Sequence, residues 1–442
     1  MAQADCDDVF GCADAAQVEE LRQMLAAYKE AVSNGELDEA DVLAKRVMEL
    51  SIVINGRDST HSANALINLA FVQQQKEQYD TARINYLAAI DTIEGINGAL
   101  SVDLIQPLHR LGETEIALGE AQRAMESFSR AVDIGHVNKG PQNLDQVETL
   151  EAIAELHAMS GNYSAALDIQ QSIYAYRGRA YGSESEEFLP AMEHYAKWMH
   201  RLSLYNKERN TYLRMIKIQE THLGKDDPRL IPNLMTVGAT FHQRGFLPDD
   251  DRNIARLAGA GPDYYMRRAL RIATEHPDSD WRLRSTTALS VGDYYTRSHR
   301  FSRARAIYRD AWRAMSSHPD GLITQRKEFQ SPVLLEDREL PEFYEDQYPL
   351  YEPESTEGFE RGSITAEFDV TQSGKIVNVK VIEAQPPGHT NIEKLLVDEL
   401  KYVMHRPRME DGEPVDTRGM IFVYDYFYKN SDPNDQTTSM NR

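Results

Sequence analysis

The chain has 442 residues, with 48 basic and 70 acidic side chains and a formal net charge of −22. This excess of negative charge argues against nucleic acid as the main partner. No apolar run approaches the roughly 18 residues that a membrane-spanning helix needs, and the length exceeds what one compact core holds, which predicts more than one domain.

The first segment, residues 1–15, is predicted to be mobile. Ala2-Gln3-Ala4 has the small-x-small form found at the end of a secretory signal, and we therefore expect the chain to act in the periplasm. Cys6 and Cys12 are the only cysteines. In an oxidising compartment they could close a small loop, and the alternative is two free, incidental thiols.

A helical repeat follows. In the stretch Leu108–Ala131, Gly112 and Ala124 are small enough to let two antiparallel helices approach, while larger apolar side chains fill the seam at helical spacing. The Ala124 position belongs to the series 40, 82, 124, 166 and 208, in which neighbouring positions are 42 residues apart. The Gly112 position recurs with the same period from residue 28 to residue 238, and then at residue 292, 54 residues on. The 12 extra residues fall in or near LPDDDRNIARLAG.

These residues resemble the tetratricopeptide repeat, whose pattern is W-x2-L-G-x2-Y followed by A-x3-F. Leu108, Leu111, Gly112, Ala124 and Phe128 match that pattern, and Glu115 stands where the family usually has Tyr. The period exceeds the usual one of about 34 by about two helical turns, as in the long-helix variants of kinesin light chains. We predict a mostly α-helical fold, with a solenoid of about seven helical hairpins over residues 16–318.

The first helix of each repeat lines the concave face in this architecture, and its outward positions are candidates for a partner-binding groove. The groove is predicted to change from acidic to basic and to bind a protein or peptide of the opposite charge order. A purely solvated helix face is the alternative for any one residue. The candidates are Asn64, Phe71, Gln74, His109, Glu113, Glu148, Glu151, Glu155, Lys197, His200 and Arg201.

The next segment, residues 319–360, is predicted to be a linker rich in Pro and Tyr. Between Ser331 and Glu360 it carries ten acidic residues against one basic residue. The preceding stretch Arg267–Arg313 has eleven arginines against five acidic residues. We therefore hypothesise that the acidic, aromatic segment lies back on the arginine-rich last repeat.

From residue 361 the apolar period changes from 3.6 to 2. Ile364–Val370 alternates as a half-buried strand, a turn at Gly374 follows, and Ile376–Ile382 forms the returning strand. An apolar helical stripe runs from Ile392 to Val403, and Met420–Tyr428 forms a last strand. The prediction is a small α+β domain of order β-β-α-β over residues 361–430, with a disordered tail at residues 431–442.

This part of the chain resembles the C-terminal domain of TonB proteins. The resemblance lies in the stretches GSITAEFDVTQSGKIVNVKVIEAQPPG and RPRMEDGEPV and in the final aromatic strand. His405-Arg406 departs from that family, which prefers an aromatic residue there. The resemblance implies that an extended segment of a TonB-dependent transporter adds as a strand to the edge of the sheet. It places that receiving edge on the last strand, at Met420, Phe422, Tyr424, Tyr426 and Tyr428.

No motif of an enzyme is present: G-x-S-x-G, H-E-x-x-H, the phosphate-binding loop and G-x-G-x-x-G are all missing from the sequence. We therefore expect no catalytic residue, cofactor or metal. The expected function is that of a periplasmic adaptor in which the solenoid binds one protein and the TonB-like domain engages a TonB-dependent transporter or an inner-membrane energising complex. The alternative is an envelope scaffold whose TonB-like domain serves docking or dimerisation without a transporter.

Overall fold

The structure is a computed structural model that describes residues 15–241, 261–335, 340–350, 353 and 356–430. The predictions for the N-terminal segment with Cys6 and Cys12, the 12-residue insertion and the tail lie outside these residues, apart from Ala15 and Gly261 at the borders. Two compact units divide the chain between Leu204 and Tyr205.

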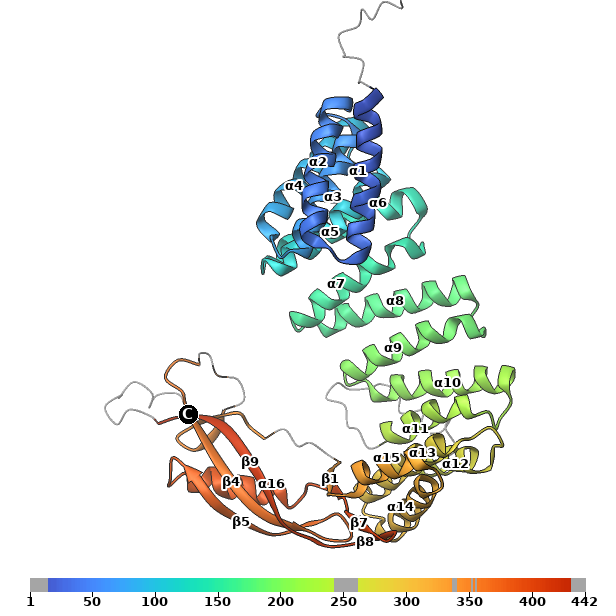
Figure 1. Cartoon of the computed structure of the whole chain (residues 1–442), viewed down its shortest axis with the longest axis vertical. Helices are drawn as coiled ribbons and strands as arrows, with labels where there is room; N and C mark the ends of the chain where they lie inside the picture. Colours follow the sequence, from blue (N-terminus) through green and yellow to red (C-terminus); the bar gives the residue numbers. More distant parts are fainter. Residues whose placement is uncertain (1–14, 242–260, 336–339, 351–352, 354–355, 431–442) are drawn as a thin grey trace, which may run out of the picture. The chain divides into compact units, whose positions relative to one another are not determined.

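The first unit consists of helices arranged as successive antiparallel pairs (Figure 1). Short 3-10 turns precede α5, α7 and α9. The helices are α1 (Ala15–Asn34), α2 (Leu37–Asn55), α3 (Thr60–Gln75), α4 (Tyr79–Asn97), α5 (Ile105–Ala117), α6 (Ala121–Lys139), α7 (Val147–Met159), α8 (Tyr163–Tyr181) and α9 (Leu189–Arg201).

Small residues let the two helices of a pair approach, as the sequence pattern predicts. A Cβ atom on Gly112 would lie 2.6 Å from the Phe128 ring, so the two helices α5 and α6 have no space for a side chain there. Ala82 and Ala124, at the other small position of the repeat, are 0% exposed. The prediction of stacked helical hairpins is confirmed in this unit.

The second unit begins with further helices of the same kind and ends in a sheet. Gly238 and Gly292 occupy the Gly112 position, and a Cβ atom on Gly292 would lie 2.5 Å from the Tyr308 ring. The helices are α10 (Tyr205–Leu223), α11 (Ile231–Thr240), α12 (Pro262–Glu275), α13 (Trp281–Arg297), α14 (Phe301–Ser316) and α15 (Pro319–Phe329).

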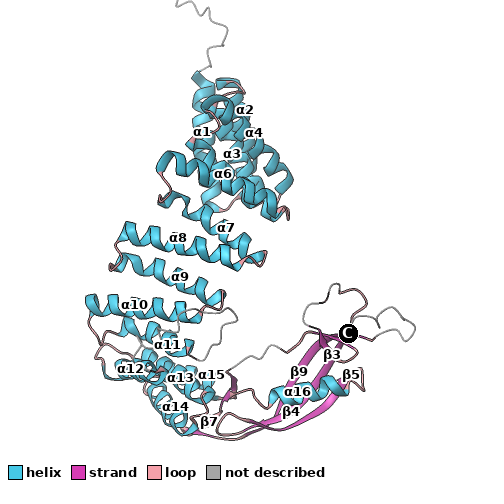
Figure 2. Ribbon diagram, turned by 180° about the vertical axis from the view of Figure 1, so that it is seen from behind, coloured by secondary structure: helices cyan, strands magenta, loops and turns pink. Residues whose placement is uncertain are grey.

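The C-terminal sheet has five strands in the order β3-β2-β9-β4-β5. Its strands are β2 (Phe343–Glu345), β3 (Tyr348–Leu350), β4 (Glu360–Val370), β5 (Ile376–Gln385) and β9 (Thr417–Lys429). The helix α16 (Thr390–Leu400) lies across one face of the sheet (Figure 2), and its Ile392, Leu396 and Leu400 are buried against Ile364 and Phe368. The predicted β-β-α-β order is present as β4, β5, α16 and β9, but the sheet is larger than predicted.

The additional strands come from the predicted linker. Residues 319–360 contain α15, the two sheet strands β2 and β3, and β1 (Val333–Leu334), which pairs with β6 (His405–Arg406). The segment predicted to be a linker therefore contains regular secondary structure in these elements. The remaining short strands, β7 (Met409–Glu410) and β8 (Glu413–Pro414), pair with each other.

The described part of the acidic, aromatic segment packs on the sheet. Phe343 stacks on Phe427 with ring centroids 5.3 Å apart, and the Tyr344 hydroxyl lies 2.8 Å from that of Tyr424 in a buried hydrogen bond. Among described residues, Arg305 and Arg309 of α14 instead pair with Glu413.

Candidate partner-binding surfaces

The predicted groove residues all lie on the first helices of successive repeats, α3, α5, α7 and α9. We call the side chains of these four helices that are predicted to face outward the first-helix surface. Asn64, Glu148, Lys197 and His200 are exposed, Phe71 and Gln74 are partly buried, and His109 is buried. The structure brings most of them into contact with the next repeat, which the sequence analysis did not predict.

Polar contacts run from each first helix to the next. The Gln74 amide donates to Glu113 Oε2 over 3.1 Å, linking α3 to α5. His109 Nδ1 lies 3.0 Å from Thr149 Oγ1, linking α5 to α7. Between α7 and α9, His194 Nε2 lies 2.8 Å from Glu151 Oε1, and the Arg201 guanidinium donates to both oxygens of Glu155.

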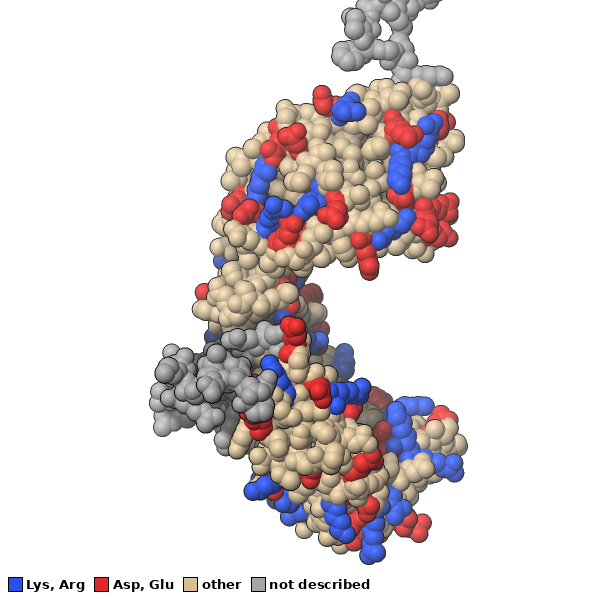
Figure 3. Space-filling view, turned by 90° about the vertical axis from the view of Figure 1, so that its left-hand side faces the viewer, with Lys and Arg blue, Asp and Glu red and all other residues tan. Residues whose placement is uncertain are grey.

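The predicted acidic stretch of the groove is thus largely neutralised within the chain. Of its three carboxylates, Glu151 and Glu155 pair with His194 and Arg201 of the following repeat, and only Glu148 is highly exposed, at 73% of its side chain. Acidic and basic side chains also lie next to one another on the face of the first unit that Figure 3 shows. The predicted change from acidic to basic side chains along the groove, and partner binding by this surface, stay predictions.

Burial would raise the pKa of Glu113, but its contacts with His109 and Arg110 outweigh that effect and lower the pKa to about 2. Glu113 therefore stays ionised inside the stack. The Arg110 guanidinium, which pairs with Glu113 at 2.8 Å, also lies 5.6 Å from the centre of the Phe71 ring. This ring is thus partly covered by a cation from the next repeat.

The predicted receiving strand β9 is an inner strand along part of its length. It pairs with β4 from Thr417 to Tyr428, and β2 pairs in parallel with its last residues, Phe427 to Lys429. The prediction of a free edge is therefore wrong at Tyr428. Among described residues no strand covers the other side of Met420–Asp425, so that shorter stretch keeps an open backbone edge.

Side chains alternate along this open stretch. One set of side chains packs into the core between the sheet and α16: Met420, Phe422, Tyr424 and Tyr426. These residues can offer a partner their backbone groups but not their side chains. Ile421 and Val423 point the other way and are 53% and 56% exposed. Exposed β-branched side chains beside an unpaired strand edge are typical of a surface that receives another strand.

An apolar hollow of about 230 Å³ adjoins the same stretch. Its wall includes Leu334, Leu340, Leu400, Val403, Ile421 and Phe422. Such a hollow can accept an apolar side chain from a segment that lies along β9.

A buried ion cluster that the sequence analysis missed joins the sheet domain to the last repeat. Arg406 of β6 donates to Asp293 of α13 over 2.9 and 2.7 Å and also pairs with Glu328 of α15. The side chains of Arg406 and Asp293 are 8% and 12% exposed. The unusual His405-Arg406 pair thus has a structural role, because the arginine crosses from one domain into the other.

The contacts between repeats leave a weak signal in the sequence. Gln74 to Glu113, His109 to Thr149, and Glu155 to Arg201 span 39, 40 and 46 residues, which is one period of 42 with an offset of up to four. Complementary polar residues separated by about one repeat period are therefore candidates for contacts between neighbouring repeats. No comparable rule finds Asp293 and Arg406, which lie 113 residues apart.

No helix in the described part of the chain is long and apolar enough to cross a membrane. Residues 65–91 and 103–179 match tetratricopeptide repeat families, so the chain contains tetratricopeptide repeats, whose fold typically serves as a non-enzymatic scaffold for protein–protein interaction. None of the curated proteins compared with the chain matches it.

Solved structures similar to the chain are also repeat proteins. One holds the TPR-like repeats of a Podosopora anserina protein described as a kinesin light chain, at 16% identity and a TM-score of 0.41, covering 46% of this chain and 97% of that one. BtubC (BKLC) from P. vanneervenii is 15% identical with a TM-score of 0.35, covering 60% and 95%. A TPR repeat-containing protein from Cytophaga hutchinsonii is 11% identical with a TM-score of 0.40, covering 69% and 98%.

Proposed function

We propose that this protein is a periplasmic adaptor whose repeats bind one protein and whose C-terminal domain receives an extended segment of another, in TonB-dependent transport across the outer membrane. The observation that carries the second half is the open edge of β9 at Met420–Asp425. The repeats support the other part of the proposal, the binding of a first protein, because stacked hairpins expose a long surface suited to proteins.

The binding mode follows from the direction of the backbone groups. The Phe427 N–H donates to the Glu342 carbonyl on the β2 side of β9. Because strand residues alternate, and the pairing of β9 with β4 is regular from Met420 to Tyr428, Ile421, Val423 and Asp425 direct their backbone groups to the same side. An incoming strand would hydrogen-bond to these groups and place an apolar side chain in the neighbouring hollow.

The full chain and two variants test this proposal. Val423→Pro removes one N–H from the open edge without removing a bond to β4, whereas Val423→Thr keeps the N–H and the β-branched shape. Each protein is used to capture proteins from an envelope extract. We expect the full chain and Val423→Thr to recover an outer-membrane transporter, and Val423→Pro to lose it while retaining the circular dichroism of the folded chain.

Equal recovery by all three proteins would contradict strand addition at β9. If no transporter is recovered and the chain forms dimers in sedimentation experiments that Val423→Pro abolishes, the envelope scaffold with a self-pairing domain is favoured instead. Cell fractionation tests the periplasmic location separately.

A further inference from the structure

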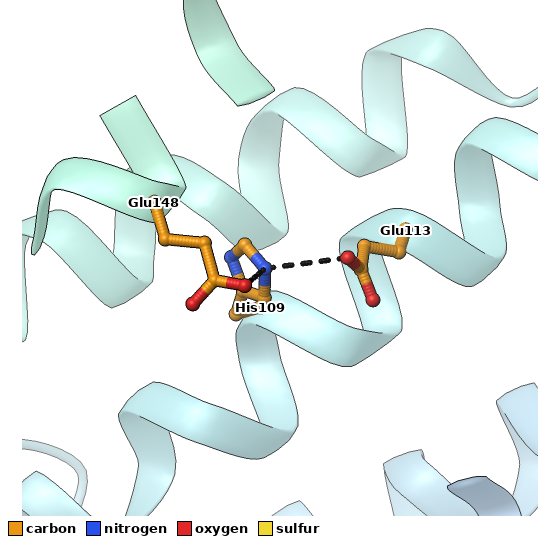
Figure 4. A group of neighbouring side chains, drawn as sticks. All are labelled: His109, Glu113 and Glu148. Atoms are coloured by element: carbon orange, nitrogen blue, oxygen red, sulfur yellow. Dashed lines mark ion pairs between the residues drawn. The ribbon is translucent and has the colours of Figure 1, made fainter. Parts of the chain in front are cut away.

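Three side chains that can bind a metal converge between the third and fourth repeats (Figure 4). His109 and Glu113 are four residues apart on α5 and so lie on one helix face, while Glu148 comes from the start of α7. Each offers one ligand atom, and these atoms all lie within 4.8 Å of one another. Figure 4 shows the His109 ring between the two carboxylates.

The imidazole is buried and has one nitrogen without a hydrogen bond. His109 is 6% exposed, and its Nε2 is a buried atom with no hydrogen-bond partner among described residues. Its Nδ1 lies 3.0 Å from Thr149 Oγ1. In the tautomer that donates from Nδ1 to Thr149, this hydrogen bond fixes the ring orientation and the Nε2 lone pair is directed at the carboxylates, as in histidines that bind metals.

The spacing of the ligand atoms fits a small cation. Nε2 lies 3.4 Å from Glu113 Oε1 and 3.6 Å from Glu148 Oε1. In a tetrahedral zinc site with bonds of about 2.1 Å, neighbouring ligand atoms are about 3.4 Å apart. These two distances are therefore long for hydrogen bonds but close to the edges of a zinc coordination shell.

The charges are also suitable. Glu113 uses Oε2 to accept from Arg110 and Gln74, and Oε1 is the oxygen that faces His109. Glu148 is 73% exposed, so it can adjust its position, and water can reach the fourth coordination position from its side. A neutral imidazole and two carboxylates balance the charge of a divalent ion.

We propose that His109, Glu113 and Glu148 bind a divalent transition-metal ion of the zinc class, which joins the third repeat to the fourth. The observations that support this site include neither the β9 edge nor the proposed adaptor function, although its three residues belong to the predicted partner-binding groove. The competing arrangement is a protonated His109 held by the two carboxylates without any metal, and the experiment below separates the two.

The experiment measures Zn²⁺ binding to the untagged full chain by calorimetry. The main variant is Glu148→Gln, because its exposed side chain can change without disturbing the fold. Glu126→Gln on α6, also exposed, removes the same charge from a neighbouring helix and is the matched control. Thr149→Val removes the partner of Nδ1 and leaves the three ligands in place.

We expect one Zn²⁺ ion per chain at this site, binding at least about tenfold weaker in Glu148→Gln and about 10–100-fold weaker in Thr149→Val. The control is expected to bind as the unchanged chain does. Co²⁺ should give visible absorption bands of a low-coordinate site that Glu148→Gln alters. Absence of Zn²⁺ binding, or equal affinity in Glu148→Gln and Glu126→Gln, would overturn the proposal and favour the protonated histidine.

Discussion

Each unit contains an arginine–carboxylate pair that joins two of its own parts, but the two pairs differ in how far they are exposed to water. In the first unit, Arg201 and Glu155 join two repeats with side chains that are 49% and 42% exposed. In the second unit, Arg406 and Asp293 join the sheet domain to the last repeat with side chains that are 8% and 12% exposed. An exposed pair is screened by water and contributes little to stability. A buried pair stabilises little overall, yet the loss of one partner leaves an uncompensated charge.

The largest effect is expected for Arg406→Gln, which leaves Asp293 buried without its cation. We expect the free energy of unfolding of the second unit to fall by about 3–5 kcal/mol. In a Trp198→Phe background, the fluorescence of Trp281 and Trp312 reports on the second unit alone during urea unfolding. Arg408→Gln, whose side chain is 28% exposed, is the control and should lose less than about 1 kcal/mol. Similar losses of stability in the two variants would show that burial of the Arg406–Asp293 pair does not determine the cost of removing the arginine.

Acid should weaken the same junction through His405. Burial lowers the pKa of this imidazole from 6.5 to about 4. Between these pH values the unfolded chain binds a proton that the folded chain does not, so stability falls as the pH falls, by at most about 3 kcal/mol. His405→Phe cannot take up this proton.

Urea unfolding of the unchanged chain and of His405→Phe between pH 7 and pH 4 tests this expectation. The difference in stability between the two proteins should change by up to about 3 kcal/mol in favour of the variant as the pH falls. A constant difference over this range would mean that His405 does not titrate in the folded chain as described.

The close contacts between paired helices also differ between the two units. A Cβ atom would lie 2.5 Å from the Tyr308 ring at Gly292 and 2.6 Å from the Phe128 ring at Gly112. The Tyr308 hydroxyl is held by Asp293 at 2.8 Å and Thr296 at 2.9 Å, so this ring is less free to move away. Gly292→Ala is expected to lower stability by about 1–3 kcal/mol, and Gly112→Ala by less.

Thermal unfolding of both variants measures this difference. Gly95→Ala is the control, because nothing lies within 4 Å of its Cβ position, and the gain in helix propensity should stabilise it slightly. A larger loss for Gly112→Ala than for Gly292→Ala would contradict the role of the Tyr308 hydrogen bonds.

The smallest effect is expected for Arg201→Gln. The exposed contact with Glu155 should contribute about 0–1 kcal/mol, and less in concentrated salt. Urea unfolding of the first unit, followed by Trp198 fluorescence in a Trp281→Phe and Trp312→Phe background in low and high salt, measures it. A loss as large as that of Arg406→Gln would remove the distinction between the two units.

The repeating pattern by itself determined the helical part of this protein. Helix spacing and the small residues at Ala82, Gly112 and Ala124 are local in sequence and recur every 42 residues, so they define each hairpin without knowledge of its neighbours. The period-2 alternation of Ile364–Val370 likewise predicts β4 in its place.

Only the tertiary structure decided which side chains remain available for binding. The outward positions of one first helix face the next, so Glu151 and Glu155 pair with the following repeat, and two strands from the predicted linker extend the sheet and cover the end of β9. These contacts, like that between Asp293 and Arg406, join residues far apart in the chain. The repeat period gives only the approximate separation of the contacts between repeats. It carries no information about the added strands or about Asp293 and Arg406, because these contacts depend on how the elements are placed in space.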